Sequence, residues 1–264
     1  MTGRLSSQRC DLLAVAVIPA RYTSRRFPGK PLANETGKYL IQHVYERVCQ
    51  ARSIQQVIVA TDDERIRLAA ESFGARAIMT GAEHACGTDR AAEVAGSLPG
   101  EVEVIVNVQG DEPEIEPDYI DRLVGLLEQD RQCSMATLAC PFGPQMDPTD
   151  PNRVKVVLDD AGRALYFSRS LIPYPRDQAG RVSRPSDYLL HLGIYAYRRE
   201  CLLDYPAWAP GRLEQIEHLE QLRALEHGVK IAVGLVERAT IGIDTPDDYA
   251  AFVRRVRAAS SGQT

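Results

Sequence analysis

Residues 12–32 read LLAVAVIPARYTSRRFPGKPL, and this stretch decides the fold. Its first part, Leu12–Ile18, is apolar without interruption. Such a run is typical of a parallel strand that is covered on both faces of a sheet. The prolines and the glycine that follow indicate a loop. We therefore expect a buried first strand whose carboxyl end opens into a loop rich in arginine.

Strand and helix patterns alternate along the next part of the chain. Apolar residues between Lys38 and Arg52 recur at three- and four-residue spacing, which predicts an amphipathic helix, and Gln56–Thr61 (QVIVAT) has the pattern of a second strand. This alternation predicts right-handed crossovers and a mostly parallel sheet. Further strands are expected over 75–80, 102–108 and 135–140, and further helices over 63–73, 88–97 and 118–129.

The pattern changes after about residue 150. Segments 154–158 and 164–168 flank Asp159–Arg163, where a glycine indicates a hairpin turn. The sequence therefore predicts a single Rossmann-like α/β domain over 12–258, with a mixed or antiparallel C-terminal appendage. The remaining elements are strands over 191–197 and 231–236, helices over 213–227 and 246–258, a flexible N-terminal tail over 1–11 and a C-terminal tail over 259–264.

Composition excludes several classes of protein. The chain has 264 residues, 44% of them hydrophobic and 25% charged, which is ordinary for a globular domain. Its net charge of −5 argues against nucleic acid as a partner, since phosphate neutralisation needs a basic face. No apolar run reaches the roughly 18 residues of a membrane span. The six cysteines are scattered without a C-x-x-C pair, and no cleavage site follows Leu12–Ile18, so we expect a cytoplasmic protein.

The loop after the first strand has the composition of an anion site. In doubly wound sheets, ligands bind beyond the carboxyl ends of the strands. The loop is not a Walker A sequence, because Ser24 stands where that pattern needs its first glycine and Pro31 where it needs Ser or Thr. A solvated basic loop is the structural alternative. The candidate phosphate ligands are Arg21, Arg25, Arg26 and Lys30, with Ser24 and Gly29 allowing close backbone approach.

Two carboxylates follow other strands. Asp111 lies in Gln109-Gly110-Asp111-Glu112-Pro113 at the end of the fourth expected strand, where a hard cation such as Mg²⁺ can be held. Asp244 precedes Thr245-Pro246, which reads as an ordinary helix start. Helix capping is therefore the alternative for both residues. Together with the basic loop, they form a coherent site for a cation that bridges phosphate oxygens.

Three further clusters have both a functional and a structural interpretation. Gly87–Arg90 opens a helix and either contacts a nucleobase or only caps the helix. Arg169 ends a strand and faces either a substrate carboxylate or a surface ion pair. His191 and Tyr195 share one face of a strand, where a lone histidine is usually structural. A solvated acidic helix face is the default for Glu214, Glu217, Glu220 and Gln221.

These motifs, taken in order, resemble the CMP-Kdo synthetases, which are the 3-deoxy-manno-octulosonate (Kdo) cytidylyltransferases. The resemblance begins with 15–22, Ser24, Arg26 and 28–32, and it extends over about residues 14–255. It continues through Ile58–Asp62, Gly87-Thr88, Asn107–Pro113, Leu165–Arg169, His191–Tyr195, Leu219–Arg223 and Asp244–Pro246. It implies a nucleotidyltransferase domain that activates Kdo with CTP, releases pyrophosphate and supplies lipopolysaccharide biosynthesis. It also implies Mg²⁺ as cofactor and a homodimer.

The resemblance also implies roles for individual residues. Arg26, Lys30, Asp111 and Asp244 would be catalytic, with Asp111 and Asp244 holding Mg²⁺. The nucleotide would contact Ala20, Arg21, Ser24, Arg26, Lys30, Thr80, Gly87, Thr88 and Gln109. The sugar acid would contact Gln109, Arg169, His191, Tyr195, Glu220 and Gln221, with Arg169 gripping its carboxylate.

Two positions depart from the family pattern, because Cys86 replaces the usual Ser before Gly-Thr and Asp89 replaces Glu. A thiol is a weak hydrogen-bonding group, so the departure bears on contacts to the base. Three alternatives stay open. They are a cytidylyltransferase for an amino-substituted Kdo or a sialic-acid-like sugar, a nucleotidyltransferase for another base, and a nucleotide-sensing protein without turnover.

Overall fold

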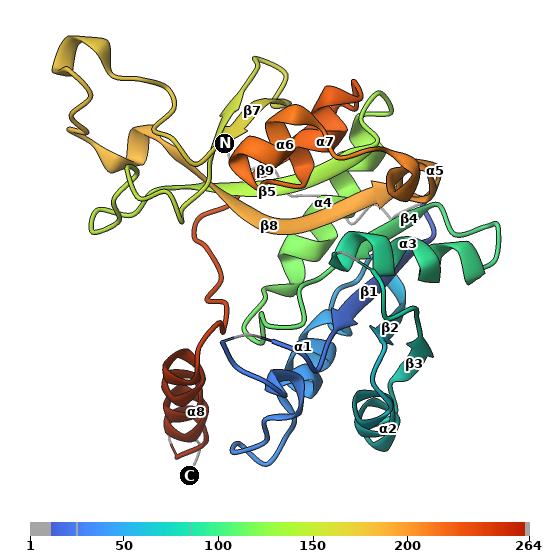
Figure 1. Ribbon diagram of the computed structural model, residues 1–264. Helices are drawn as coiled ribbons and strands as arrows, with labels where there is room; N and C mark the ends of the chain where they lie inside the picture. Colours follow the sequence, from blue (N-terminus) through green and yellow to red (C-terminus); the bar gives the residue numbers. More distant parts are fainter. Residues whose placement is uncertain (1–11, 25, 85, 262–264) are drawn as a thin grey trace, which may run out of the picture.

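The computed structural model describes residues 12–24, 26–84 and 86–261. Within these residues the strands form one nine-stranded sheet in the order β3-β2-β1-β4-β8-β5-β9, and β6 joins it beside β8 and pairs with β7. Helices cover both faces of the sheet (Figure 1). The strands are β1 (Ala14–Ala20), β2 (Ile54–Thr61), β3 (Arg76–Met79), β4 (Val104–Asn107), β5 (Met135–Pro141), β6 (Lys155–Leu158), β7 (Ala164–Ser168), β8 (Leu189–Arg198) and β9 (Ile231–Leu235).

The N-terminal half is the expected parallel unit. Strand β1 lies between β2 and β4 and runs parallel to both, and β2 runs parallel to β3. The buried pattern of β1 explains its position, because every residue from Ala14 to Ile18 is at most 3% exposed. The mixed α/β fold class that the sequence predicts is confirmed.

Antiparallel strands are built into the sheet as well as appended to it. Strand β8 runs antiparallel to β4 on one side and to β5 on the other, while β9 returns parallel to β5. The register of β8 shifts between Leu192 and Tyr195, which pair with the consecutive residues Leu138 and Thr137. This bulge inserts two residues into β8, an even number, so His191 and Tyr195 keep the same face of the sheet.

Two layers of helices complete the domain. Helices α1, α2 and α4 pack on one face of the sheet, and α3, α5 and α7 pack on the other. The helices are α1 (Leu40–Val48), α2 (Glu64–Ser72), α3 (Gly87–Ser97), α4 (Pro117–Gln129), α5 (Arg199–Asp204), α6 (Arg212–Glu217), α7 (Gln221–Glu226) and α8 (Pro246–Ser261), with short 3₁₀ turns at Lys30–Leu32, Arg176–Gln178, Pro185–Asp187 and Tyr205–Ala207.

The single helix expected over 213–227 is wrong, because two short helices occupy that range. His218 adopts the left-handed conformation, with φ of 50°, and separates α6 from α7. The guanidinium of Arg169 accounts for the break. Its Nε donates to the Glu217 carbonyl at 2.6 Å and its Nη2 to the His218 carbonyl at 3.2 Å. These are the carbonyls that a continuous helix would bond to N–H groups four residues ahead.

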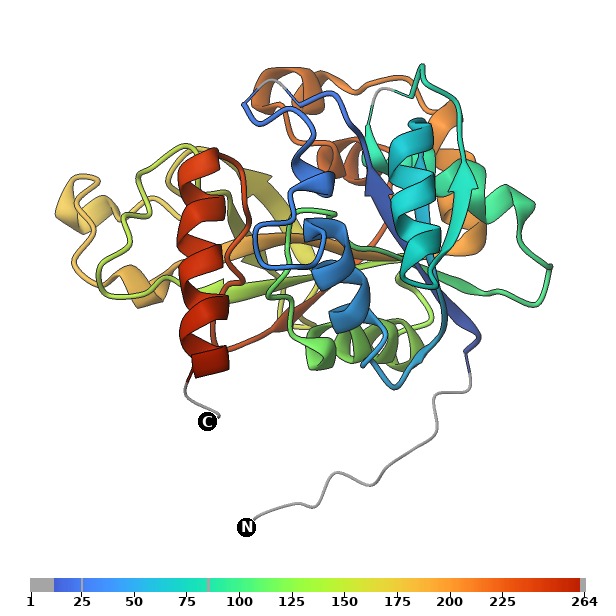
Figure 2. The same ribbon diagram turned by 90° about the horizontal axis from the view of Figure 1, so that it is seen from below.

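The C-terminal helix α8 lies beside the loop after β1 and the start of α1 (Figure 2). Tyr249, Phe252 and Val253 of α8 form a separate apolar cluster with Leu40 and the partly buried Phe27. This packing carries the residues before α8 to the loop after β1. Helix α8 ends at Ser261, inside the range 259–264 that the sequence assigns to a tail, and residues 1–11 lie outside the described residues.

None of the helices built from the described residues is long and apolar enough to cross a membrane.

Candidate functional site

The loop between β1 and the turn at Lys30–Leu32 is closed on itself by its backbone. The Gly29 N–H donates to the Tyr22 carbonyl at 2.9 Å, and Gly29 has a φ of +70°, which only glycine adopts readily. Arg21 donates through Nη2 to the His84 carbonyl at 2.6 Å and so ties this loop to the one before α3. The predicted residue Arg25 lies outside the described residues. The loop is thus held at the carboxyl edge of the sheet.

Arg26, Lys30, Asp111 and Asp244, the four residues predicted as catalytic, form one cluster at this edge. Lys30 Nζ donates to Asp111 Oδ2 and to the Ile243 carbonyl, at 2.7 Å in each case. Arg26 Nη2 donates to Asp244 Oδ1 at 2.8 Å. The Ile243 N–H donates to the Asp111 carbonyl at 2.8 Å, which joins the segment before α8 to the end of β4. Residues separated by more than 200 positions in sequence therefore meet here.

The structure excludes helix capping as the role of either carboxylate. Helix α4 begins at Pro117 with Glu116 as its N-cap, so Asp111 caps no helix. At the start of α8, Thr245 Oγ1 accepts the Asp248 N–H at 3.2 Å, and Asp248 Oδ2 accepts the Asp244 and Thr245 N–H groups. Thr245 and Asp248 therefore do the capping. The Asp244 carboxylate is directed to Arg26 instead.

The two carboxylates fit a Mg²⁺ ion. Mg²⁺ takes hard oxygen ligands and is commonly held by one or two carboxylates together with substrate phosphates and waters. No group of three or more His, Cys, Asp and Glu side chains among the described residues could enclose a metal alone. Asp111 and Asp244 would therefore need phosphate oxygens to complete the coordination of an ion. Lys30 and Arg26 balance their charges in this structure.

Gly110 places Asp111 by its lack of a side chain. A Cβ at position 110 would lie 2.8 Å from the Pro19 carbonyl oxygen and 3.3 Å from Ile41 Cδ1. Since the first of these atoms belongs to the backbone of β1, the strand ends could not approach this closely with any other residue. The site thus depends on glycine at this position for its geometry.

A cavity of about 390 Å³ lies at the carboxyl end of β4 and against the first half of β8, from Leu190 to Tyr195. Six of the residues predicted to contact substrate line it, namely Thr88, Gln109, His191, Tyr195, Glu220 and Gln221. Gln109 Nε2 donates to the Gly193 carbonyl at 3.4 Å, which links the carboxylate cluster to the bulge of β8. Gln109 lines the cavity and precedes Asp111 by two residues, so the cavity and the carboxylate cluster are neighbours along the chain.

His191 is an uncharged wall of this cavity. Its Nε2 lies 3.0 Å from Thr137 Oγ1, and its ring meets Phe167 edge-on with the ring centroids 4.8 Å apart. Burial lowers the pKa of His191 to about 3, so the imidazole is neutral at physiological pH. It can therefore offer hydrogen bonds to hydroxyl groups but no charge to a carboxylate.

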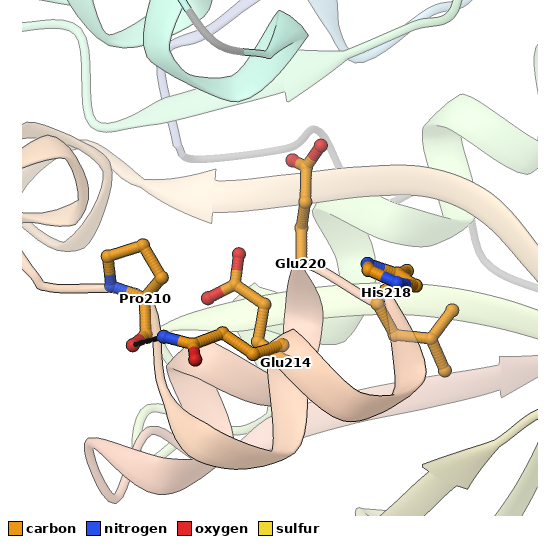
Figure 3. A pocket seen from close by; sticks show the side chains of 6 residues that line it. Pro210, Glu214, His218 and Glu220 are labelled. Carbon is orange, nitrogen blue, oxygen red and sulfur yellow. Dashed lines mark hydrogen bonds between the residues drawn. The ribbon is translucent and has the colours of Figure 1, made fainter.

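Glu220 connects the cavity to the start of α3. Its Oε2 accepts a hydrogen bond from Thr88 Oγ1 at 3.1 Å. Figure 3 shows the Glu220 side chain rising from the α6–α7 turn, above a neighbouring hollow of about 370 Å³ that Pro210, Glu214 and His218 also line. Burial, and next the charge of Glu220, raises the pKa of the Cys86 thiol to about 12. Cys86 thus stays protonated, as the serine usual at this position would.

Gln221, in the wall of the cavity, has a buried side-chain donor without a partner in the described part of the chain. The residue is 6% exposed, and its Nε2 has no hydrogen-bond partner among the described residues. A buried amide without a partner is costly unless a ligand or water satisfies it. Its position in the wall of the cavity indicates an acceptor on a bound molecule.

Arg169 does not line the cavity. Besides its bonds to Glu217 and His218, Nη1 donates to the Pro151 carbonyl at 3.0 Å. Three of its five N–H groups are thus used to hold two walls of the cavity together. Its contact with a substrate carboxylate stays a prediction.

The remaining predicted nucleotide contacts are placed as follows. Ala20 ends β1 and is 3% exposed, and Gly87 opens α3 beside Pro19. Ser24 Oγ accepts the Phe27 N–H at 3.3 Å inside the loop. Thr80 Oγ1 donates to the Thr61 carbonyl at 3.2 Å and accepts a hydrogen bond from Arg90. The side chain of Thr80 is therefore used within the protein.

Seven further residues of the cavity were not predicted as site residues, namely Leu190, Gly193, His218 and Leu219, and the segment Asn152, Arg153 and Val154 before β6. The His191 N–H donates to the Val154 carbonyl at 2.9 Å, so the segment before β6 lies beside β8. Only the pairing of β6 with β8 brings these residues to the site, and no periodic pattern announces that pairing. His218 was hidden because its range reads as one helix.

Comparison with known proteins identifies the class. Residues 15–231 match the family model described as cytidylyltransferase. A solved structure entitled CMP:2-keto-3-deoxy-manno-octonic acid synthetase complexed with CTP superposes with a TM-score of 0.84 and 43% identity, covering 96% of this chain and 100% of that one. A cytidylyltransferase from Leptospira borgpetersenii, 18% identical with a TM-score of 0.60, shares the fold. The fold is that of the cytidylyltransferases, which are nucleotidyltransferases.

Curated relatives narrow the family. A 3-deoxy-manno-octulosonate cytidylyltransferase from Syntrophobacter fumaroxidans is 52% identical over 240 residues, which are 90% of this chain and 95% of the relative. One from Geobacter sulfurreducens is 47% identical over 248 residues, covering 92% and 98%. The chain belongs to the 3-deoxy-manno-octulosonate cytidylyltransferase family, and the resemblance seen in the sequence is confirmed.

Proposed function

We propose that the protein transfers the cytidylyl group of CTP to Kdo, giving CMP-Kdo and pyrophosphate for lipopolysaccharide biosynthesis, and that it requires Mg²⁺. The observation that supports this most strongly is that the predicted triphosphate residues form one cluster and that six predicted substrate-contacting residues line one cavity next to it along the chain. A cluster of two basic residues and two carboxylates lies at the ends of β1 and β4. Gln109, two residues before Asp111, lines the neighbouring cavity of about 390 Å³.

The reaction needs positioning and charge neutralisation rather than a covalent enzyme intermediate. The anomeric hydroxyl oxygen of the sugar acid attacks the α-phosphorus of CTP, the bond from that phosphorus to the β-phosphate bridging oxygen breaks, and the hydroxyl proton passes to solvent or a nearby base. Arg26 and Lys30 would bind the triphosphate oxygens after leaving their carboxylate partners. Holding both reactants in line supplies much of the rate.

Asp111 and Asp244 would hold the Mg²⁺ ion, which neutralises phosphate charge and helps to lower the pKa of the attacking hydroxyl. Lys30 Nζ donates to Asp111 in this structure, so Lys30 and a metal ion would compete for the same carboxylate. On the sugar side, His191 and Gln221 would bind hydroxyl groups, and Glu220 would link the sugar to the base through Thr88.

A substrate matrix tests this proposal and separates the alternatives. Pyrophosphate release is measured with Mg²⁺ for CTP, UTP, ATP and GTP, each against Kdo, 8-amino-8-deoxy-Kdo and N-acetylneuraminate. We expect release with CTP and Kdo alone. Pyrophosphate release with CTP and another acid would show that the sugar substrate is not Kdo alone. Release with another nucleotide would show that the protein does not require cytosine. Failure of every pair, from folded protein that binds CTP, would favour a nucleotide sensor.

Two further expectations stay predictions from the sequence. They are the cytoplasmic location and the homodimer. Light scattering of the purified protein, which gives its mass in solution, checks the second against the 29.2 kDa of one chain.

A further inference from the structure

The two proposed metal carboxylates lie on segments from distant parts of the chain. Asp111 follows β4, whereas Asp244 directly precedes the C-terminal helix α8. The Ile243 N–H joins the segments by donating to the Asp111 carbonyl at 2.8 Å. Lys30 also joins them, but its bond to the Asp111 carboxylate is the one that a metal ion would displace. Since Mg²⁺ demands near-ideal octahedral coordination, whatever else fixes the separation of these segments bears on metal binding.

An ion pair between Glu114 and Arg255 joins the same two segments. Arg255 Nε donates to Glu114 Oε1 at 3.0 Å, and Nη2 donates to Glu114 Oε2 at 2.5 Å. Glu114 comes three residues after Asp111, and Arg255 lies on α8, which begins two residues after Asp244. The side chains are 34% and 38% exposed, so the pair is partly shielded from water. The guanidinium fork on both carboxylate oxygens makes this tie directional.

Other hydrogen bonds hold the chain on the near side of Asp244. They run from Thr240 Oγ1 to Glu112 Oε2, from Arg238 Nη2 to Glu116 Oε1 and from Tyr119 Oη to the Arg238 carbonyl, at 2.9, 2.9 and 2.7 Å. All of them fasten residues that precede Asp244. The pair of Glu114 with Arg255 is a tie on the far side, so the Asp244 segment is held to the Asp111 segment from both directions.

The length of α8 turns the far tie into a lever on Asp244. The helix packs through an apolar cluster that includes Tyr249, Phe252 and Val253. Apolar packing is not directional, so the cluster alone leaves α8 able to pivot. Arg255 lies about 14 Å along the helix axis from Pro246, on the other side of this cluster. Release of Arg255 would therefore let the end of α8 that carries Asp244 shift.

We infer that Glu114 and Arg255 are positioning residues that set the separation of the two carboxylates proposed to hold the divalent cation. The inference rests on the proposed function, because it concerns the Mg²⁺ ion that the proposed reaction requires.

The test measures CTP binding by calorimetry, without Kdo, in EDTA and in Mg²⁺. The ratio of the two Kd values gives the coupling between metal and nucleotide, and Mg²⁺ complexes free CTP to the same extent for every variant. We expect Arg255→Gln and Glu114→Gln each to lower this ratio by about 2- to 5-fold, as the loss of a half-exposed ion pair allows, with the Kd in EDTA unchanged. The charge-swapped variant Glu114→Arg/Arg255→Glu should recover most of the ratio.

Arg163→Gln is the matched control. Arg163 pairs with Asp130 at 2.8 Å, the two side chains are 23% and 28% exposed, and the pair joins separate segments near the amino end of β5. Its loss should leave the ratio unchanged. With Ca²⁺ in place of Mg²⁺, Arg255→Gln should lose less of the ratio, because Ca²⁺ accepts more flexible coordination.

The outcomes separate the inference from the proposed function. A wild-type ratio in Arg255→Gln and Glu114→Gln, or a Kd that rises equally in EDTA and in Mg²⁺, would overturn the positioning role. If Mg²⁺ did not tighten CTP binding to the wild type, or if Asp244→Asn kept the full ratio, the metal site of the proposed function would fall, and the inference with it.

Discussion

The ion pair between Lys30 and Asp111 offers the sharpest test of the proposed site. In the absence of substrate, each of the two proposed metal carboxylates is balanced by a basic side chain. Lys30 has 12% of its side chain exposed and Asp111 has 32%, so the pair lies between a surface pair and a buried one. Surface pairs contribute about 0.2–1 kcal/mol, and breaking buried pairs costs about 3–5 kcal/mol. We therefore expect a coupling free energy of about 1–3 kcal/mol.

A double-mutant cycle measures this coupling. The free energy of unfolding is determined by urea denaturation, with EDTA and without nucleotide, for the wild type, Lys30→Met, Asp111→Asn and the double variant. Lys38 and Glu46 form the matched control, because their atoms are 2.6 Å apart while 47% and 39% of their side chains are exposed. That pair should couple by less than about 0.5 kcal/mol. Additive effects at Lys30 and Asp111 would refute the pairing from which the site is built.

Magnesium gives the same cycle a second readout. In Lys30→Met the Asp111 carboxylate has lost its nearest cation, so Mg²⁺ alone should raise the free energy of unfolding more than it does in the wild type. In Lys30→Met/Asp111→Asn this extra stabilisation should disappear. An equal Mg²⁺ response in all four proteins would contradict the assignment of Asp111 as a metal ligand.

Three other predictions concern the support of the site. Gly110→Ala should lower the free energy of unfolding by about 1–3 kcal/mol and reduce turnover, because the new Cβ would lie 2.8 Å from the Pro19 carbonyl oxygen. The measurement is urea denaturation, and Gly125→Ala is the control, because a Cβ at that position of α4 has no neighbour within 4 Å among the described residues. Arg169→Ala should cost about 2–4 kcal/mol of stability through its three lost carbonyl bonds. Arg153→Ala, which loses one long bond to Asp150, should cost less than about 0.5 kcal/mol, and equal melting temperatures would contradict the structural role of Arg169. Burial lowers the pKa of His191 from 6.5 to about 3, so the unfolded chain binds a proton at a higher pH than the folded protein does. The free energy of unfolding should therefore fall by up to about 2 kcal/mol as the pH drops from 6.5 to 5. His191→Gln should lack this loss when denaturation is measured at each pH.

The sequence predicts the parallel half of this fold well because local pattern and tertiary position agree there. The apolar run of β1 is buried on both faces, and the helix expected over 38–52 contains α1 with its buried Ile41 and Val44. The sequence could also predict the Arg/Lys loop and the two carboxylates as site residues, since each follows a strand that ends at the same edge of the sheet. The sequence pattern could not predict which basic residue pairs with which carboxylate.

The antiparallel half was harder to predict because tertiary contacts override local pattern. The range 213–227 has a continuous helical spacing, yet Arg169, some fifty positions earlier, takes the carbonyls that the helix needs. The sequence could not predict these contacts, since an arginine at a strand end gives no sign of which groups it binds. Arg153 lay in a Pro- and Asp-rich stretch without periodicity, and only the pairing of β6 with β8 reveals its place.

Direct detection of the product is the simplest test of the proposed transfer of the cytidylyl group from CTP to Kdo. CTP, Kdo and Mg²⁺ are incubated with the protein and the mixture is followed by ³¹P NMR. The account predicts that the three CTP signals disappear together while one phosphodiester signal, from CMP-Kdo, and one pyrophosphate signal appear in equal molar amounts, with neither formed by Asp111→Asn. Intact CTP in the presence of folded, CTP-binding wild-type protein would contradict it.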